Sequence, residues 1–356
     1  MSASETDLGM QSGIFHSTYQ ADMALRRTHA EKIRLVLFLL FMMVFPFFAN
    51  RYHLTLANQV GIATIGAIGL NILVGFTGQI SLGQGGFMAV GAYTAGILSA
   101  QMGMPWYVST LIACFVTAFV GAIFGIPSLR LKGLYLAIAT LAAQEIILWV
   151  VTHWDAVTGG VDALVTPDPM LFGIQINNDF NFYWLVWLLA GVSALLTVNL
   201  FRTRFGRAFV AIRDQDIAAE TMGINLFRYK LLSFAISSFF VGLSGALIAH
   251  YRNIVTWERF TVDVSVTYLA MIIIGGLGSV RGSFFGAAFM TLLPAVITNI
   301  GRALKTSFPF IDSIMPFIQQ AMFGLVIILF LVFEPEGLNK IWRNIKDYFR
   351  LWPFSY

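Results

Sequence analysis

The chain has 356 residues, of which 58% are hydrophobic and 11% are charged, and its mean hydropathy is +0.76. Soluble domains carry roughly 25% charged residues, so this composition excludes an ordinary water-soluble globular protein. The formal net charge of +4 comes from basic residues scattered through polar segments, which argues against a nucleic-acid-binding face.

The polar segment of residues 1–34 is predicted to be a retained cytoplasmic tail, because it lacks the apolar core and cleavage site of a secretory signal. Beyond it, apolar blocks of roughly 16 to 22 residues alternate with short polar segments, and about 20 helical residues cross a bilayer. We therefore predict an all-α integral membrane protein, a polytopic helical bundle of about ten transmembrane helices that forms a permease domain of residues 35–338. The predicted spans are residues 35–49, 56–74, 80–100, 106–126, 133–152, 183–200, 231–250, 261–276, 283–300 and 316–333.

Lys and Arg predict the orientation of these spans, because cytoplasmic loops retain basic residues. With the N-terminus inside, 17 of the 22 basic residues fall on the inside, and residues 153–182 form an external loop with four Asp and no Lys or Arg. Both termini are then cytoplasmic, including the tail of residues 339–356. The span over 261–276 is short and the one over 80–100 begins with glycines; without these two, eight spans remain and the termini keep their side.

Residues 69–96 gather glycines and polar side chains at membrane depth, among them Asn71, Gln79, Ser81 and Gln84. Small residues let helices approach closely, so tight helix packing is one explanation. The other is a broken helix beside the transport pathway, because irregular backbone in a membrane is tolerated where protein or a water-filled cavity covers it. On this second interpretation, Gln79, Ser81 and Gln84 line the substrate pathway.

Glu145 lies within the predicted span 133–152, where an ionised carboxylate is costly unless it is paired, hydrated or protonated. It is therefore a candidate pathway residue. The alternative is a carboxylate that reaches water or a neighbouring helix near the outer end of the span.

The longest internal loop, residues 201–230, is predicted to contain a short helix on the membrane surface. Between Asp214 and Gly223, apolar residues recur at helical spacing after two acidic residues that suit a helix N-terminus. The alternative is a basic surface loop without a docking role.

Several segments together resemble the high-affinity branched-chain amino acid permease family of ABC importers, in its LivM-like branch. The similarity runs from about residue 60 to 338, and urea and short-chain amide permeases resemble the same pattern. It is carried by residues 69–96, the similar glycine-rich stretch IIIGGLGSVRGSFFGAAF at 272–289, GLYLAIATLA at 133–142, the turn Thr158, Gly159 and Gly160, GRAFVAIRDQDIAAETMGIN at 206–225 and FGLVIILFLVFEPEGL at 323–338.

The resemblance implies that the internal loop holds a coupling helix that docks into a groove on an ATPase subunit. Ala218, Ala219 and Gly223 match the family's Ala, Ala, three spacers, Gly pattern. Ile217 departs from it where the family carries Glu, so the acidic contact falls to Asp216 or Glu220. The implied coupling residues are Asp216, Ile217, Ala218, Ala219, Glu220, Met222 and Gly223.

The resemblance further implies a permease subunit for branched-chain amino acids, or alternatively for urea or short-chain amides, in a bacterial inner membrane. Its partners would be a homologous permease, two ATP-binding cassette ATPases, a periplasmic solute-binding protein and membrane lipid. The sequence has no G-x-x-x-x-G-K-[ST] loop, so ATP and Mg are expected to bind the ATPases. The scattered histidines lack metal-ligand spacing and no nucleophile elbow is present, so the chain is not expected to be an enzyme or to hold a metal or cofactor. A stand-alone secondary transporter or channel is a further alternative, in which the loop at 206–225 would have no docking role.

Overall fold

The computed structural model describes residues 29–127, 131, 133–171, 174–176, 178–304, 311–334 and 336–351. Most of the predicted tail 1–34, the last residues 352–356, and the basic residues Arg130 and Lys132 lie outside these ranges. The chain divides into two compact units, one of Thr55–Lys340 and one of Met1–Leu54 with Ile341–Tyr356.

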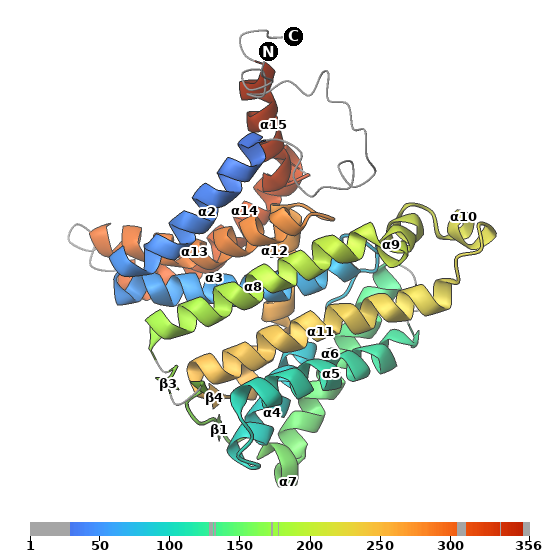
Figure 1. The fold of residues 1–356 in the computed structure, drawn as a ribbon. Coiled ribbons are helices and arrows are strands. Elements are labelled where there is room, and N and C mark those ends of the chain that lie inside the picture. The colour runs from blue at the N-terminus through green and yellow to red at the C-terminus, as the bar shows by residue number, and fades with distance from the viewer. Residues whose placement is uncertain are drawn as a thin grey trace. The chain divides into compact units, whose positions relative to one another are not determined.

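Nearly all of the described chain is helical (Figure 1). The smaller unit holds α2 (His29–Phe48) and most of α15 (Leu338–Leu351). The larger unit contains most of α3 (Arg51–Leu73), and then α4 (Gln84–Ala100), α5 (Trp106–Gly125), α6 (Leu134–His153), α7 (Asp155–Thr158), β1 (Leu164–Val165), β2 (Met170–Leu171), β3 (Ile174–Gln175), α8 (Asp179–Arg202), α9 (Arg204–Asp214), α10 (Asp216–Thr221), α11 (Leu226–Arg252), β4 (Ile254–Val255), the 3-10 helix η2 (Trp257–Phe260), α12 (Val262–Gly275), α13 (Val280–Leu304) and α14 (Ile311–Phe333).

Each of the ten predicted apolar segments coincides with a helix, so the predicted all-α polytopic membrane fold is confirmed. Within the residues that the structure describes, seven helices are long and apolar enough to cross a bilayer. α4 has 17 residues and α12 has 14, which is less than the roughly 20 that one straight helix needs. The segments at 80–100 and 261–276 therefore depart from a simple span, and α2, at the predicted segment 35–49, is also not among the seven.

Several helices extend beyond the predicted bounds. α8 begins at Asp179 instead of residue 183, and α11 begins at Leu226 instead of residue 231. The prediction followed apolar side chains only, whereas a helix can continue past the hydrocarbon core to where polar side chains meet headgroups and water. The irregular parts of the predicted loops 153–182 and 201–230 are correspondingly shorter.

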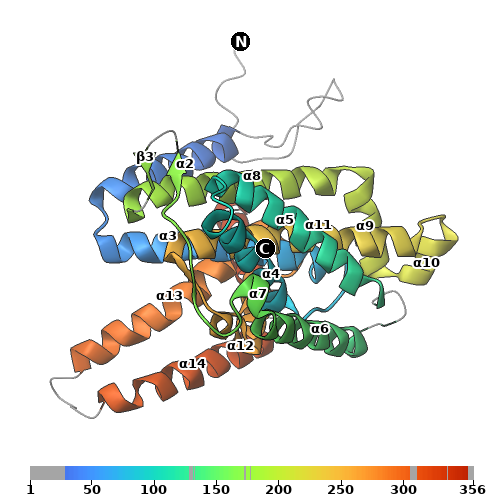
Figure 2. The ribbon, with the colours of Figure 1, turned by 90° about the horizontal axis from the view of Figure 1, so that it is seen from below.

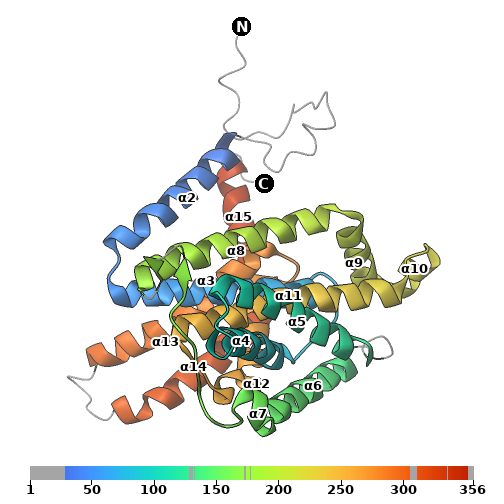
Figure 3. The same cartoon turned by 60° about the horizontal axis from the view of Figure 1, so that its bottom comes forward.

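The interior of the larger unit is built around α4, which packs against α5 and α11 (Figures 2 and 3). Twelve of its 17 residues are buried. A Cβ atom at Gly91 would collide with the backbone of Gly242 on α11, so glycine is needed there for the two helices to touch. The predicted tight helix packing in the glycine-rich segment is therefore present.

The two ends of the larger unit have different structures. At one end, β1 from the predicted external loop pairs antiparallel with β4, which follows α11. At the other end, α9 and α10 connect α8 to the start of α11, and Figure 1 shows α10 and β4 at opposite ends of α11. The predicted external and internal loops therefore lie on opposite sides of the bundle.

α13 and α14 lie side by side in Figures 2 and 3 and pack against α12. Only 6% of the apolar window of α14 is buried within this chain. Lipid or another protein must cover the remaining apolar surface of α14 in a membrane.

α15 occupies much of the predicted C-terminal tail 339–356. Its apolar residues Ile341, Trp342 and Ile345 recur at helical spacing between basic residues. The tail is therefore an amphipathic helix over most of its length.

Candidate functional site

The internal loop is mostly helical, and one extended residue, Gln215, separates its helices α9 and α10. α9 ends at Asp214, Gln215 is extended with φ −160° and ψ 102°, and α10 then begins at Asp216. The predicted helix over 214–223 is thus shorter than expected, with six residues, because the extended Gln215 interrupts the helical hydrogen bonding. Phe209 and Ile212 of α9 are buried and hold that helix on the bundle.

Gly223 ends α10 by a left-handed turn. Its φ of +85° is a conformation that residues with a Cβ rarely adopt, and no atom lies within 4 Å of the Cβ position. The Ile224 N–H donates to the Ala219 carbonyl at 3.0 Å, as expected for a glycine-terminated helix. Glycine is therefore required here by backbone conformation and not by a neighbouring surface.

α10 presents apolar side chains to the outside. Ile217 is 63% exposed and Met222 is 84% exposed, whereas Ala219 is buried against the bundle. Glu220 and Ala218 are also exposed. Large apolar side chains on a solvent-side helix mark a surface that another protein can cover.

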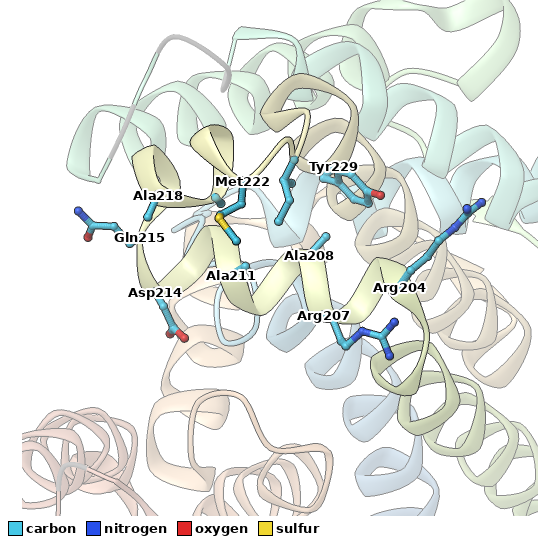
Figure 4. A pocket seen from close by; sticks show the side chains of 11 residues that line it. Arg204, Arg207, Ala208, Ala211, Asp214, Gln215, Ala218, Met222 and Tyr229 are labelled. Carbon is cyan, nitrogen blue, oxygen red and sulfur yellow. The ribbon is translucent and has the colours of Figure 1, made fainter. Parts of the chain in front are cut away.

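A hollow of about 500 Å³ lies between α9, α10 and the start of α11 (Figure 4). Its apolar lining includes Ala211 and Met222, and Arg204 and Gln215 lie near its two ends. The predicted coupling residues Ala218, Ala219 and Met222 all contribute to this lining. An apolar floor with polar and charged side chains around it suits a short protein segment that carries apolar anchors.

An ion pair fixes the start of α10. The Nζ atom of Lys230, on α11, lies 3.7 Å from Oδ2 of Asp216, and the two side chains are 9% and 20% exposed. Because water is partly excluded there, the pair is screened less than a surface pair. Asp216, predicted as a coupling residue, is thus also an anchor of α10.

At this same end of the bundle the two glycine-rich segments meet. α3 stops at Leu73, and an irregular stretch precedes α4, so the predicted broken helix is present. The buried Asn71 joins this break to the one between α12 and α13. Its Oδ1 accepts from the Gly278 N–H at 2.9 Å, and its Nδ2 donates to the Ser279 carbonyl at 2.9 Å and to Ser283 Oγ at 2.8 Å.

Three of the four predicted pathway residues are buried near this break. Gln79 Nε2 donates to Ser233 Oγ at 2.7 Å, while its Oε1 is buried and has no hydrogen-bond partner among the described residues. Gln84 Nε2 donates to the Gly66 carbonyl at 3.1 Å, and Ser81 Oγ accepts from the Gly83 N–H at 3.3 Å. Gln79 thus ties this region to α11 and Gln84 ties it to α3, whereas the bond of Ser81 stays within the irregular stretch.

Glu145 lies apart from these three residues. Its side chain is exposed on α6, whereas its neighbour Gln144 is fully buried and contacts Ser265 of α12. With its amide oriented to suit its neighbours, Gln144 donates to the Leu82 carbonyl and accepts from the Val262 N–H, both at 3.0 Å. Gln144, not Glu145, therefore connects α6 to the break before α4.

Sequence reasoning did not assign a site role to Asn71, Gln144 or Ser283. Asn71 and Ser283 lie in the two glycine-rich stretches, and Gln144 is the neighbour of Glu145 in the predicted span 133–152. A polar amide at membrane depth was the available signal, because such a group must find a partner inside the protein.

The family model for "Branched-chain amino acid transport system / permease component" matches residues 52–332. The chain belongs to this family. It is 32% identical over 340 residues, 89% of this chain and 76% of the relative, to the high-affinity branched-chain amino acid transport system permease protein LivM of Salmonella typhimurium. It is also 28% identical over 233 residues, 64% of this chain and 66% of the relative, to a probable LivM permease of Methanocaldococcus jannaschii.

A second kind of permease is similar as well. The probable branched-chain amino acid transport permease protein LivH of Methanocaldococcus jannaschii is 27% identical over 297 residues, 79% of this chain and 89% of the relative. No solved structure matches the chain. The predicted family and the function of a multi-pass membrane permease subunit are therefore confirmed.

Proposed function

We propose that this permease forms the translocation pathway of an ATP-driven importer for branched-chain amino acids. The observation that carries this proposal is the 32% identity over 340 residues to a LivM permease whose name specifies that transport system. Urea or a short-chain amide is the second candidate cargo, because a polar pathway lined by amides and hydroxyls suits those solutes as well.

The proposed assembly contains a homologous permease, two ATP-binding cassette ATPases and a periplasmic solute-binding protein in a bacterial inner membrane. The similarity to both LivM and LivH relatives supports a pair of different permeases. ATP and Mg would bind the ATPase subunits. The exposed apolar side chains Ile217 and Met222 support a protein partner at α10.

Ten spans with both termini in the cytoplasm are the proposed topology, and the ends of α4 support it. Before α4, Gly78 lies against Arg213 of α9, at the internal end of the bundle. After it, Gln101 Nε2 donates to the Val157 carbonyl in the predicted external loop at 3.3 Å. The irregular stretch and the 17-residue helix α4 together thus reach from one end to the other.

α12 has the same arrangement in the opposite direction. It follows β4 and η2 at the external end, and it ends at Gly275, close to the Asn71 and Gly278 contact at the internal end. Counting α2, α4 and α12 with the seven long helices gives ten spans. If α4 and α12 were only half-deep segments, eight would remain with the termini on the same side.

The proposed mechanism is alternating access. ATP-driven closure of the ATPase pair moves α10, and the bundle then reseals on one side and opens on the other. We propose that the pathway, when the break opens, is lined by Gln79, Ser81 and Gln84. Glu145, on α6, is also proposed as a pathway residue. The buried Gln79 Oε1 supports this assignment, because an unpartnered amide oxygen can accept a hydrogen bond from a polar solute.

Uptake by proteoliposomes tests the cargo. The permease, reconstituted with the partner subunits encoded for the same system, is given ATP inside and radiolabelled leucine, valine or urea outside with the binding protein. We expect ATP-dependent accumulation of leucine and valine. Accumulation of urea alone would assign the alternative cargo, and equal uptake without ATP would contradict the importer.

A further inference from the structure

Arg213, near the end of α9, reaches from the internal loop to the break after α3. Its Nη1 donates to the Gly75 carbonyl at 2.7 Å. Gly75 lies in the turn that follows α3, where the carbonyls carry the negative end of the helix dipole. A guanidinium is therefore well matched to this carbonyl by charge and by hydrogen bonding.

The same side chain also lies against the break between α12 and α13. A Cβ atom built on Gly278 would be 2.6 Å from Arg213 Nη1, and one on Gly78 would be 3.4 Å from Arg213 Cα. The arginine thus extends along the irregular stretch from Gly78 and ends with its guanidinium between Gly75 and Gly278. A side chain at Gly278 would displace it.

Asn71 joins the same two breaks directly. It accepts from the Gly278 N–H and donates to the Ser279 carbonyl, so the segments that Arg213 contacts are already bonded to each other. Arg213 is separated from α10 by Asp214 and Gln215 alone. One charged group therefore connects the α9–α10 segment to both irregular segments of the bundle.

We propose that Arg213 is a positioning residue that makes the two glycine-rich breaks move together with α9 and α10. Because its guanidinium lies against Gly75 and Gly278 at once, a movement of α9 is passed to both breaks. This inference rests on the proposed function, since it identifies how movement of α10 reaches the pathway.

The first test measures uptake and ATP hydrolysis together in the reconstituted complex. For Arg213→Gln we expect the uptake per ATP hydrolysed to fall about ten-fold, which corresponds to the loss of one charge-assisted hydrogen bond. Arg213→Lys keeps the charge without the planar fork and should recover part of the loss. Arg302→Gln, the same substitution on the exposed end of α13, should behave as the wild type.

The second test needs no ATPase. Spin labels are attached at the exposed positions Met222 and Leu277, with the buried Cys114 replaced by alanine, and their distance is measured in the purified chain in nanodiscs. We expect one narrow distance distribution with Arg213 and a broader one with Arg213→Gln. Arg302→Gln should leave the distribution narrow.

The two tests separate the two hypotheses. If the wild-type complex shows no ATP-driven uptake, the proposed function fails, while the distance measurement still reports on the Arg213 link. If the wild type transports and Arg213→Gln keeps both its uptake per ATP and its narrow distribution, the inference is overturned. A loss of total uptake in Arg213→Gln would overturn it as well if the uptake per ATP hydrolysed and the distance between the labels at Met222 and Leu277 stayed unchanged. Arg213 would then have only a local structural role.

Discussion

Replacing Asn71 by leucine removes the amide that joins the two glycine-rich breaks and keeps a side chain of similar size. Three hydrogen bonds of 2.8 to 2.9 Å are lost. The Ser279 carbonyl and Ser283 Oγ still bond to each other at 3.3 Å, whereas the Gly278 N–H is left without the acceptor it has in the wild type. The cost is therefore dominated by that one donor, on the half-buried Gly278.

An unsatisfied buried donor costs about 1 to 3 kcal/mol, and each of the other two interhelical bonds contributes roughly 0.6 kcal/mol in a membrane protein. We expect Asn71→Leu to lower the free energy of unfolding by about 2 to 4 kcal/mol. Reversible unfolding by SDS in mixed micelles measures this difference. Asn299→Leu, on an exposed part of α13, is the matched control and should change it by less than about 0.5 kcal/mol. Equal stability of Asn71→Leu and the control would refute the proposed link between the breaks.

Three further predictions concern the internal loop and the pathway. Ala218→Arg should leave the protein inserted, because Ala218 is exposed, but should abolish ATP-driven uptake; normal uptake would exclude docking at α10. Asp216→Ala should leave Lys230 without its 3.7 Å counter-ion, destabilise the start of α10 by about 1 to 2 kcal/mol and speed proteolysis between α9 and α11; an unchanged cleavage rate would contradict the anchoring role. Glu145→Gln should change the KM for uptake if Glu145 acts in the pathway, and wild-type kinetics would remove it from the pathway residues.

The helices could be predicted from the sequence because lipid imposes a simple rule on length and polarity. A span of apolar residues without charges must be helical, since its backbone has no water to bond. That rule predicted all ten apolar helices and also the break in residues 69–96, where glycines and amides accumulate. Gly223 was singled out by the family pattern, but its left-handed turn is known only from the structure.

The side of each helix that faces the protein could not be predicted in the same way. In a membrane both the lipid-facing and the protein-facing sides of a helix are apolar, so the periodicity that reveals the buried face of a soluble helix is weak. Gln144 and Glu145 are adjacent in the sequence, and only the structure separates the buried amide from the exposed carboxylate. Asn71 finds its partners 207 to 212 residues away, a pairing that no local pattern indicates.

The dependence of this permease on a separate ATPase is the central claim, and purification from the native membrane tests it most directly. The chain is isolated by an affinity tag, co-purifying subunits are identified by mass spectrometry, and ATP hydrolysis is measured with leucine, valine and urea in the presence of the binding protein. The account predicts an ATP-binding cassette ATPase, a second permease and hydrolysis stimulated by a branched-chain amino acid. Recovery of the chain alone, with no ATPase, would contradict it and favour a secondary transporter or channel.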